Sequence, residues 1–296
     1  MQNFIYLIIH IVFALGMFIS LKLINIKGVN IFKAITVNYA VAALLTVSDL
    51  SVNHLSWQLR GEILLPSAGV ALLFVVSFII MSFSTQKVGI GLTTALNKMS
   101  VLIPVTVGVL YLGQTIGLFL KLLGIAVVLA SFVLILYKKS DKRSKWAVIL
   151  PMLVFIVSGM IDTSMELSRN YVIKESYDQE AFLVSVFSFA VFFSLLAVAV
   201  EALLTKGVSR KVKTTSGSRM LLYGALLGTF NFLTSKMILM NVGLMGGSVV
   251  YPIHNAAVVT FTPLAGLLFF NEVFTKRQWF GVFLAVCGVA LIASTL

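Results

Sequence analysis

Residues 63–86 read ILLPSAGVALLFVVSFIIMSFSTQ, a run of twenty-four residues without a charged side chain. A helix of about 20 apolar residues crosses the hydrocarbon core of a bilayer, which is roughly 30 Å thick. Nine further apolar stretches fill nearly all of the remaining chain, at approximately 4–23, 32–50, 91–112, 117–137, 147–169, 181–203, 220–241, 246–270 and 278–295. The pattern predicts an all-α integral membrane protein with ten transmembrane helices.

The composition of the 296-residue chain agrees with this class. Hydrophobic residues make up 59% of the sequence, charged residues make up 11%, and the mean hydropathy is +1.06. A soluble protein of this size could not bury so much apolar surface, and the connectors are too short to hold a soluble catalytic domain. Cys287 is the only cysteine, which excludes an intrachain disulfide and a cysteine-cluster metal site. We predict no catalytic residues, no metal and no cofactor.

The net charge of +12 is distributed unevenly between alternate connectors. Counting the predicted connectors in order, the first and every second one after it hold sixteen of the 22 Lys and Arg residues, whereas the others hold four. Such a bias marks the cytoplasmic loops of membrane proteins. We therefore expect a multi-pass protein of the cytoplasmic (inner) membrane, with basic clusters 138–145 and 206–219 inside and both termini outside. Contact with lipid explains the charge, and no nucleic-acid partner is predicted.

The chain divides into two similar halves, predicted as repeats 1–139 and 140–296. An offset of 158 residues aligns Asn97 with Asn255 and Gln114 with Glu272, and Gly16 matches Gly159 at an offset of 143. Each half contains five predicted helices, and an odd number inserts the second copy upside down relative to the first. Inverted five-helix repeats are a known architecture for alternating access, with a substrate site near the membrane midplane.

With these features, the chain resembles the drug/metabolite transporter superfamily, in its EamA-like ten-helix branch. The resemblance spans residues 4–295 and rests on the two five-helix repeats and the proline-containing helices followed by a turn with an acid or amide. It implies a secondary carrier with a central cavity between the halves. Glu272 matches the acidic position that ends the fourth helix of each repeat, where the first half has Gln114 instead, and this implies a structural role at a helix end.

Ionisable side chains inside a membrane are costly and are therefore functional candidates. Asp162 and Glu166 are spaced i, i+4 on one face of the predicted helix 147–169. Lys98 and Lys236 lie inside other apolar stretches and are available as partners. We expect Asp162 or Glu166 to bind a cationic group of the substrate or a coupling proton, with one of the lysines as a competing partner. The alternative is a static ion pair that joins these helices.

Uncharged polar residues form a second candidate group: Asn97, Tyr251, His254, Asn255 and Asn231. Asn97 and Asn255 are related by the repeat, so they are expected near the pseudo-twofold axis where a substrate would bind. Hydrogen bonds between tightly packed helices are the alternative role. Pro104 and Pro263 lie deep in matched helices, and each removes a backbone hydrogen bond. They are predicted as hinges or as fixed kinks.

The predicted function is a secondary active transporter of a small polar or zwitterionic metabolite, resembling an amino acid or an amphiphilic solute. It would act by alternating access, coupled to protons or to exchange. A multidrug or organic-cation exporter is the alternative, and a membrane enzyme, a channel or receptor, and a scaffold subunit are less favoured. The expected partners are a small-molecule substrate and the lipid bilayer. The stretches 117–137 and 278–295 carry glycines at seven-residue spacing and are assigned to packing or to a homodimer contact.

Overall fold

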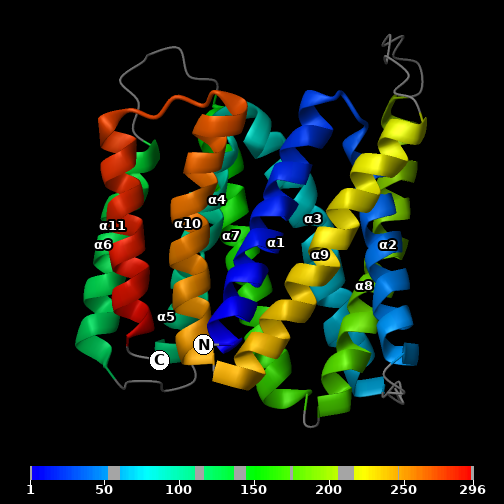
Figure 1. Cartoon of the computed structure of the whole chain (residues 1–296), viewed down its shortest axis with the longest axis horizontal. Helices are drawn as coiled ribbons and strands as arrows, with labels where there is room; N and C mark the ends of the chain where they lie inside the picture. Colours follow the sequence, from blue (N-terminus) through cyan, green and yellow to red (C-terminus); the bar gives the residue numbers. More distant parts are fainter. Residues whose placement is uncertain are drawn as a thin grey trace.

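The structure is a computed structural model, and it describes residues 2–52, 61–110, 117–136, 145–173, 176–205, 217–245 and 247–294. Within these ranges the chain forms helices and no strands (Figure 1). The helices are α1 (Gln2–Ile26), α2 (Ile31–Val52), α3 (Gly61–Val88), α4 (Ile90–Met99), α5 (Leu102–Leu110), α6 (Leu118–Leu136), α7 (Trp146–Tyr171), α8 (Ser176–Thr205), α9 (Gly217–Met245), α10 (Gly247–Phe270) and α11 (Lys276–Ala293). The predicted repeat boundary at 139/140 lies outside the described residues.

Each of the ten apolar stretches is mainly helical where it is described, but only seven helices among the described residues are individually long and apolar enough to cross a membrane. These seven are α1, α2, α3, α6, α7, α8 and α10. The helices α4 and α5 have 10 and 9 residues and are too short alone. Polar and charged residues, including Asn231 and Lys236, lower the hydropathy of α9. Lys276 and Arg277 do the same for α11, which has only 18 residues.

The predicted continuous helix at 91–112 is instead divided into α4 and α5, and Pro104 explains the division. A proline at this position has no N–H to donate to the carbonyl of Ser100, four residues earlier. That carbonyl accepts a tighter bond from the Ile103 N–H, at 2.9 Å. The helix therefore breaks at Ser100–Val101. Pro263, by contrast, lies inside the unbroken helix α10.

Short polar motifs fix the starts of two helices. The Asn30 side chain accepts a hydrogen bond from the Lys33 N–H at 3.0 Å, which caps α2. Thr275 and Gln278 form a reciprocal capping box at α11: the Gln278 N–H donates to the Thr275 hydroxyl at 3.2 Å, and the Thr275 N–H donates to Gln278 Oε1 at 2.9 Å. These caps satisfy backbone donors that the helices themselves leave unpaired.

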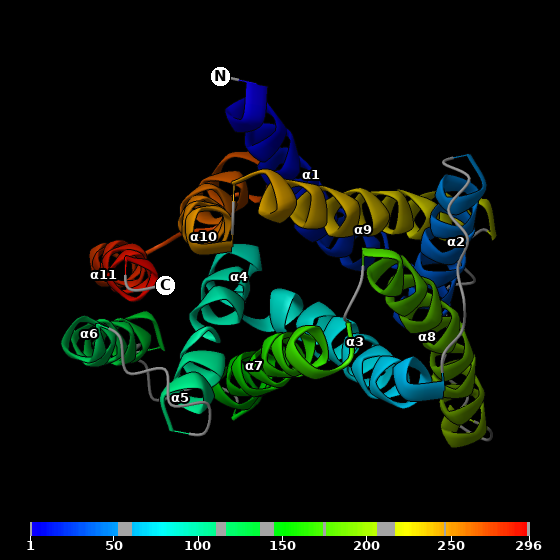
Figure 2. The same cartoon turned by 90° about the horizontal axis from the view of Figure 1, so that it is seen from below.

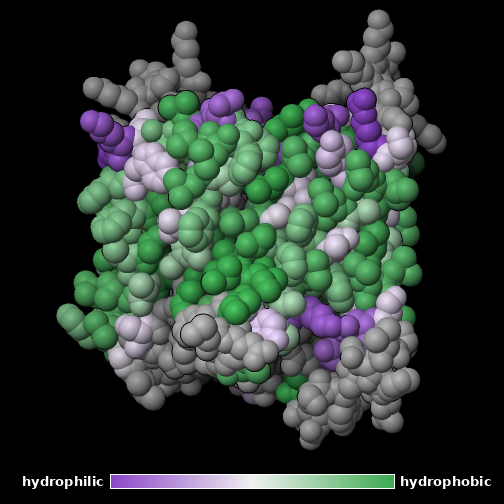
Figure 3. Space-filling view, in the orientation of Figure 1, coloured by the Kyte–Doolittle hydropathy of each residue, from purple (hydrophilic) through white to green (hydrophobic). Residues whose placement is uncertain are grey.

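The helices run side by side, and successive ones point in opposite directions, except that α5 continues in the direction of α4 (Figure 1). The turn between α1 and α2, the turn between α3 and α4, and the strap between α10 and α11 all lie at the upper end of this view, whereas both chain termini lie at the lower end. Hydrophobic side chains cover the middle of the face seen in Figure 3, and hydrophilic ones gather along its upper edge and in a patch at its lower right. This distribution suits a bundle that is surrounded by lipid.

The helices pack in matched pairs between the two halves of the chain. Helix α1 packs on α9 as α7 packs on α3, helix α2 packs on α9 as α8 packs on α3, and α10 packs on α1 as α4 packs on α7. Other main contacts join equivalent helices: α2 with α8, α4 with α10, and α6 with α11. Helix α10 also packs on α11 of its own half. In the view along the helices, α4 lies between α10 and α7 (Figure 2).

The glycines assigned to packing lie where α6 and α11 meet. A Cβ atom on Gly288 would lie 3.1 Å from the carbonyl oxygen of Gly124, and one on Gly281 would lie 2.8 Å from Ile135. Larger residues at these positions would push the two helices apart. The predicted close packing through glycine is therefore present within the chain.

Candidate functional site

Polar side chains from four helices meet near the middle of the bundle. They come from α1 and α4 in the first half and from α7 and α10 in the second. Asp162 lies about four residues beyond the middle of α7, so it is displaced by roughly 6 Å along the helix axis toward the end that holds the chain termini. Since α7 is apolar enough to span a membrane, this places a carboxylate deep within the apolar layer.

Two hydrogen bonds join α4 to α7 at this depth. The Asn97 side-chain amide donates to the Ser158 hydroxyl at 2.5 Å, and the Ser100 hydroxyl donates to Asp162 Oδ2 at 3.2 Å. Ser158 is buried, whereas Asp162 is exposed. The break before Pro104 places Ser100 just beyond the end of α4. An exposed carboxylate within an apolar span is far too costly to leave in contact with lipid, so Asp162 requires a hydrated environment.

Two histidines and a lysine form the other part of the cluster, which we name the His–Lys cluster: His10 of α1, Lys98 of α4 and His254 of α10. Lys98 Nζ lies 3.1 Å from His254 Nε2. The two imidazole rings have centroids 4.4 Å apart and an interplanar angle of 43°. Both histidines are buried, with 0% and 6% of their surface exposed. Lys98 also interacts electrostatically with Asp162, which links the two parts of the cluster.

Several nitrogens of the His–Lys cluster have no hydrogen-bond partner among the described residues. They are Nδ1 and Nε2 of His10 and Nδ1 of His254. The backbone of Thr234 lies close to His10, but it forms no hydrogen bond of acceptable geometry with the ring. Buried polar atoms are rarely left unpaired in proteins, so this group is distinct from the rest of the interior.

Some of the predicted site residues lie away from this cluster. Asn231 donates to Asn38 Oδ1 of α2 at 3.2 Å, and both residues are buried. This contact fits the alternative role of joining packed helices. Asn255 is half-buried on α10. The side chains of Glu166 and Tyr251 lie outside the described part of the structure.

The predicted pairing of Lys236 with a carboxylate of α7 is not what the structure contains. Lys236 forms an ion pair with Asp49 of α2, and its ammonium also lies 6.0 Å from the centre of the Phe232 ring. The physical reason is packing: α9 lies against α1 and α2, whereas α7 lies against α3 and α4. Lys98, the other predicted partner, is the lysine that interacts with Asp162.

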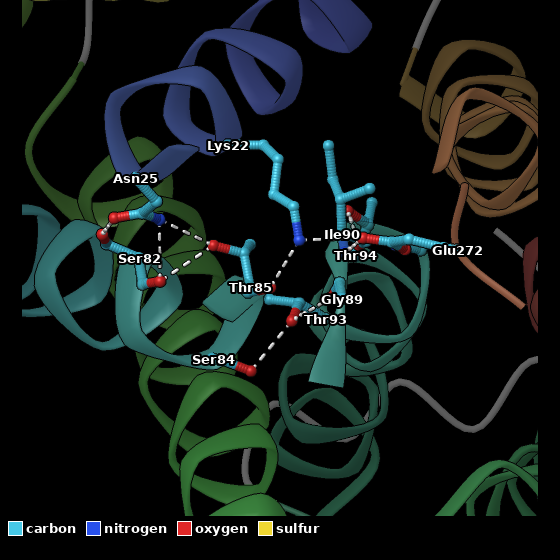
Figure 4. A network of polar contacts seen from close by, with 11 residues as sticks. Lys22, Asn25, Ser82, Ser84, Thr85, Gly89, Ile90, Thr93, Thr94 and Glu272 are labelled. Atoms are coloured by element: carbon cyan, nitrogen blue, oxygen red, sulfur yellow. Dashed lines mark hydrogen bonds and ion pairs between the residues drawn. The ribbon is translucent and has the colours of Figure 1, made fainter. Parts of the chain in front are cut away.

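A second polar network lies at the upper end of the bundle and centres on Glu272 (Figure 4). Glu272 Oε1 accepts a hydrogen bond from the Ile90 N–H at 2.7 Å, and Oε2 accepts a longer one from the Gly91 N–H at 3.3 Å. The carboxylate therefore caps the N-terminus of α4, where the helix dipole favours negative charge. Lys22 Nζ of α1 lies 3.0 Å from the same Oε1, and both side chains are largely buried.

The Lys22–Glu272 pair ties together helices from both halves. Lys22 also donates to the Thr85 carbonyl near the end of α3, at 2.9 Å. The neighbouring Asn25 amide donates to the Ser82 carbonyl and to the Thr85 hydroxyl, both at 3.0 Å. At this one point, α1, α3 and α4 of the first half are joined to the strap between α10 and α11. We call this group the Glu272 clamp, comprising Lys22, Asn25, Ser82, Thr85 and Glu272.

Glycines make room for the Glu272 clamp. Gly89 has a φ angle of 94°, which residues other than glycine rarely adopt. A Cβ atom there would lie 2.6 Å from Glu272 Oε2. A Cβ atom on Gly266 would lie 2.7 Å from the same oxygen. Gly91 allows α4 to approach the backbone of Pro263, since its Cβ would lie 2.7 Å from Pro263 Cα. The two halves could not approach this closely with larger residues.

Several contributors to these networks were not predicted from the sequence: His10, Ser100 and Ser158 near Asp162, and Lys22, Asn25, Ser82 and Thr85 in the Glu272 clamp. A single histidine in an apolar helix gives no local signal of its partners, and Lys22 was counted with the basic connector. Spacing could have drawn attention to Ser100 and Ser158, since Ser100 follows Asn97 by three residues and Ser158 precedes Asp162 by four.

A comparison of the chain with protein-family models and with curated proteins finds no match.

Proposed function

We propose that this protein is a secondary active transporter that moves a small polar or zwitterionic solute by alternating access. The observation that carries the proposal is the central group of Asp162, Lys98, His10 and His254, which is built from both halves at the depth of the apolar layer. A carrier needs a polar site that both halves can enclose. A static scaffold would have no use for an exposed carboxylate at this depth.

The proposal includes ten membrane passes arranged as two inverted five-helix repeats. The matched packing of α1 on α9 with α7 on α3, and of α10 on α1 with α4 on α7, supports it. The rod formed by α4 and α5 counts as one pass, and α9 and α11 as two more. Their polar residues find partners inside the bundle, as Asn231 and Lys236 do, so these helices need less apolar character than isolated ones.

We propose that the end with the Glu272 clamp faces the cytoplasm. Lys22, Lys27, Lys33, Lys87, Lys276 and Arg277 all lie at or next to the connectors of this end, as the positive-inside rule expects. The clamp then closes the cytoplasmic end of the pathway, while Asp162 lies in the half nearer the termini. This arrangement corresponds to a state that is open, or ready to open, toward the outside. The resemblance to the EamA-like transporters suits this reading.

An exporter of organic cations is the second candidate function. The exposure of Asp162 favours it, because a carboxylate accessible within the apolar layer would attract a lipophilic cation. The adjacent Lys98 favours the zwitterionic substrate instead, since its charge would repel a simple cation. A measurement of solute flux separates these two functions from a membrane enzyme or a scaffold.

The experiment is solute flux into proteoliposomes that contain the purified full-length protein. We expect saturable uptake of at least one labelled neutral amino acid, measured with and without a pH gradient and with unlabelled solute inside the vesicles. Protein-free liposomes provide the background, and labelled tetraphenylphosphonium tests the organic-cation alternative. Uptake no faster than background for every solute under every gradient would contradict transport.

A further inference from the structure

The hydrogen-bond roles in the His–Lys cluster can be assigned from Lys98. A lysine ammonium has three donors and no acceptor. At 3.1 Å it must therefore donate to Nε2 of His254, and a neutral imidazole that accepts at one nitrogen carries its proton on the other. The proton of His254 is thus on Nδ1, which is buried and has no partner among the described residues.

His10 adds a second donor without a partner. Its ring lies 4.4 Å from that of His254, and a neutral imidazole carries one N–H. Neither of its nitrogens makes a well-aligned hydrogen bond with a described residue, although the Thr234 backbone lies close to the ring. Two imidazole N–H groups and the ammonium of Lys98 therefore lie close together. Among the described residues, the His254 donor has no acceptor and the His10 donor has no well-aligned one. Leaving buried donors unpaired is costly, so the cluster is suited to a ligand group that accepts several hydrogen bonds.

The charge around the cluster specifies which acceptor fits best. Lys98 supplies one positive charge, and Asp162 is the anionic group that interacts with it. A carboxylate offers two oxygens, about four acceptor positions and a single negative charge, which matches one ammonium. A phosphate carries up to two charges and would meet stronger repulsion from Asp162. The cluster therefore favours a carboxylate over a phosphate.

We infer that His10, Lys98 and His254 form a carboxylate subsite, in which Lys98 pairs with the substrate carboxylate and the two histidines donate hydrogen bonds to it. This inference rests on the proposed transport function, and it specifies which group of the substrate the His–Lys cluster binds. Asp162 is then left for the amino group, and together the two subsites select an α-amino acid or a similar zwitterion. His10 becomes a specificity-determining residue on α1, whereas the other members lie on α4, α7 and α10.

The subsite also explains how substrate could be released. His10 and His254 are buried here, so a carboxylate reaches them only when α10 separates from α1 and α4. In an alternating-access cycle these helices move with their own halves, α1 and α4 with the first and α10 with the second. Separation of α10 from α4 would break the contact between Lys98 and His254 and divide the carboxylate's ligands between the two halves.

The test uses probes that differ only in the two charged groups. Binding of leucine, leucine methyl ester, isopentylamine and 4-methylpentanoate to the purified full-length protein is measured as thermal stabilisation over a concentration series. Phenylalanine and serine are tested with their own methyl esters. We expect at least one amino acid to bind about tenfold to hundredfold more tightly than its methyl ester, as loss of charged hydrogen bonds predicts. This comparison needs no variant, so folding defects cannot obscure it.

Variants then assign the carboxylate to the cluster. His10→Phe and His254→Phe keep an aromatic ring but remove its donors, and each is expected to reduce the preference for acid over ester to near unity. His54→Phe, at the one remaining histidine of the chain, is the matched control and should keep the preference.

Flux of the same probes separates the two ideas. Transport of a methyl ester or amine as fast as the acid would overturn the carboxylate subsite but not the proposed transport function. A preference for acid over ester that survives both histidine variants would have the same consequence. If none of the probes binds or moves, both the subsite and the proposed function fail. Stabilisation by inorganic phosphate that exceeds stabilisation by the amino acids would also contradict the subsite.

Discussion

Replacing Glu272 with alanine is expected to lower stability more than any other single carboxylate substitution in the described chain. The change removes the partner of Lys22 and the cap of α4, and leaves the ammonium and two backbone N–H groups without their acceptor. Breaking a buried ion pair by removing one partner costs about 3–5 kcal/mol. The loss should appear as a lower unfolding temperature of the purified protein in detergent.

Two variants show whether the clamp is the cause. Glu272→Gln keeps an oxygen for the Ile90 N–H but loses the charge, so it should destabilise less than alanine. Glu62→Ala, at an exposed carboxylate in the first turn of α3, should have little effect. An unfolding temperature for Glu272→Ala equal to that of Glu62→Ala would show that the clamp contributes little.

Replacing Asp162 with asparagine is expected to abolish transport while the protein remains folded. Asparagine is nearly the same size, and its side-chain oxygen can still accept the hydrogen bond from Ser100. It cannot neutralise a cationic group or carry a proton, so the site loses its negative charge next to Lys98. Uptake should fall by at least about 100-fold, the effect of roughly 2.7 kcal/mol in the transport barrier.

The measurement compares uptake of the best substrate by wild-type and Asp162→Asn proteoliposomes at equal protein content. Asp49→Asn is the matched control: Asp49 is paired with Lys236 on the other side of the bundle, so its loss should affect stability more than substrate selection. Unchanged uptake by Asp162→Asn would remove this carboxylate from the mechanism. Equal loss in both variants would indicate a general effect of charge removal.

The helical architecture could be predicted from the sequence because the length of an apolar run, which indicates a membrane-spanning helix, depends only on neighbouring residues. The kink at Pro104 was predictable for the same reason, since a missing N–H acts on a carbonyl only four residues away. The caps that Asn30 forms at α2, and Thr275 with Gln278 at α11, are likewise local contacts. The division of 91–112 into two short helices was not predicted, because a proline deep in a helix can either kink it or break it, and Pro263 leaves α10 unbroken.

The contacts of the site were less predictable, because they join residues that are far apart in the sequence. Lys236 and Asp49 are 187 residues apart, and nothing local indicates that α9 packs on α2 rather than on α7. Lys98 and Asp162 were identified because charges in apolar stretches stand out. His10 has no such signal, and its importance becomes visible only beside His254. Glu272 was matched to a helix end through the resemblance, but the helix that it caps, α4, belongs to the other half.

The central claim is that Asp162 lies in a hydrated site between two halves rather than against lipid. It is tested most directly by introducing Asp162→Cys into a Cys287→Ala background and measuring its reaction with a membrane-impermeant thiol reagent in sealed vesicles of each orientation. Leu196→Cys, at an exposed apolar position on α8, and Lys27→Cys, in the exposed turn after α1, are the lipid and cytoplasmic controls. The account predicts that Asp162→Cys reacts from the side opposite to Lys27→Cys. No reaction from either side, as expected for Leu196→Cys, would contradict it.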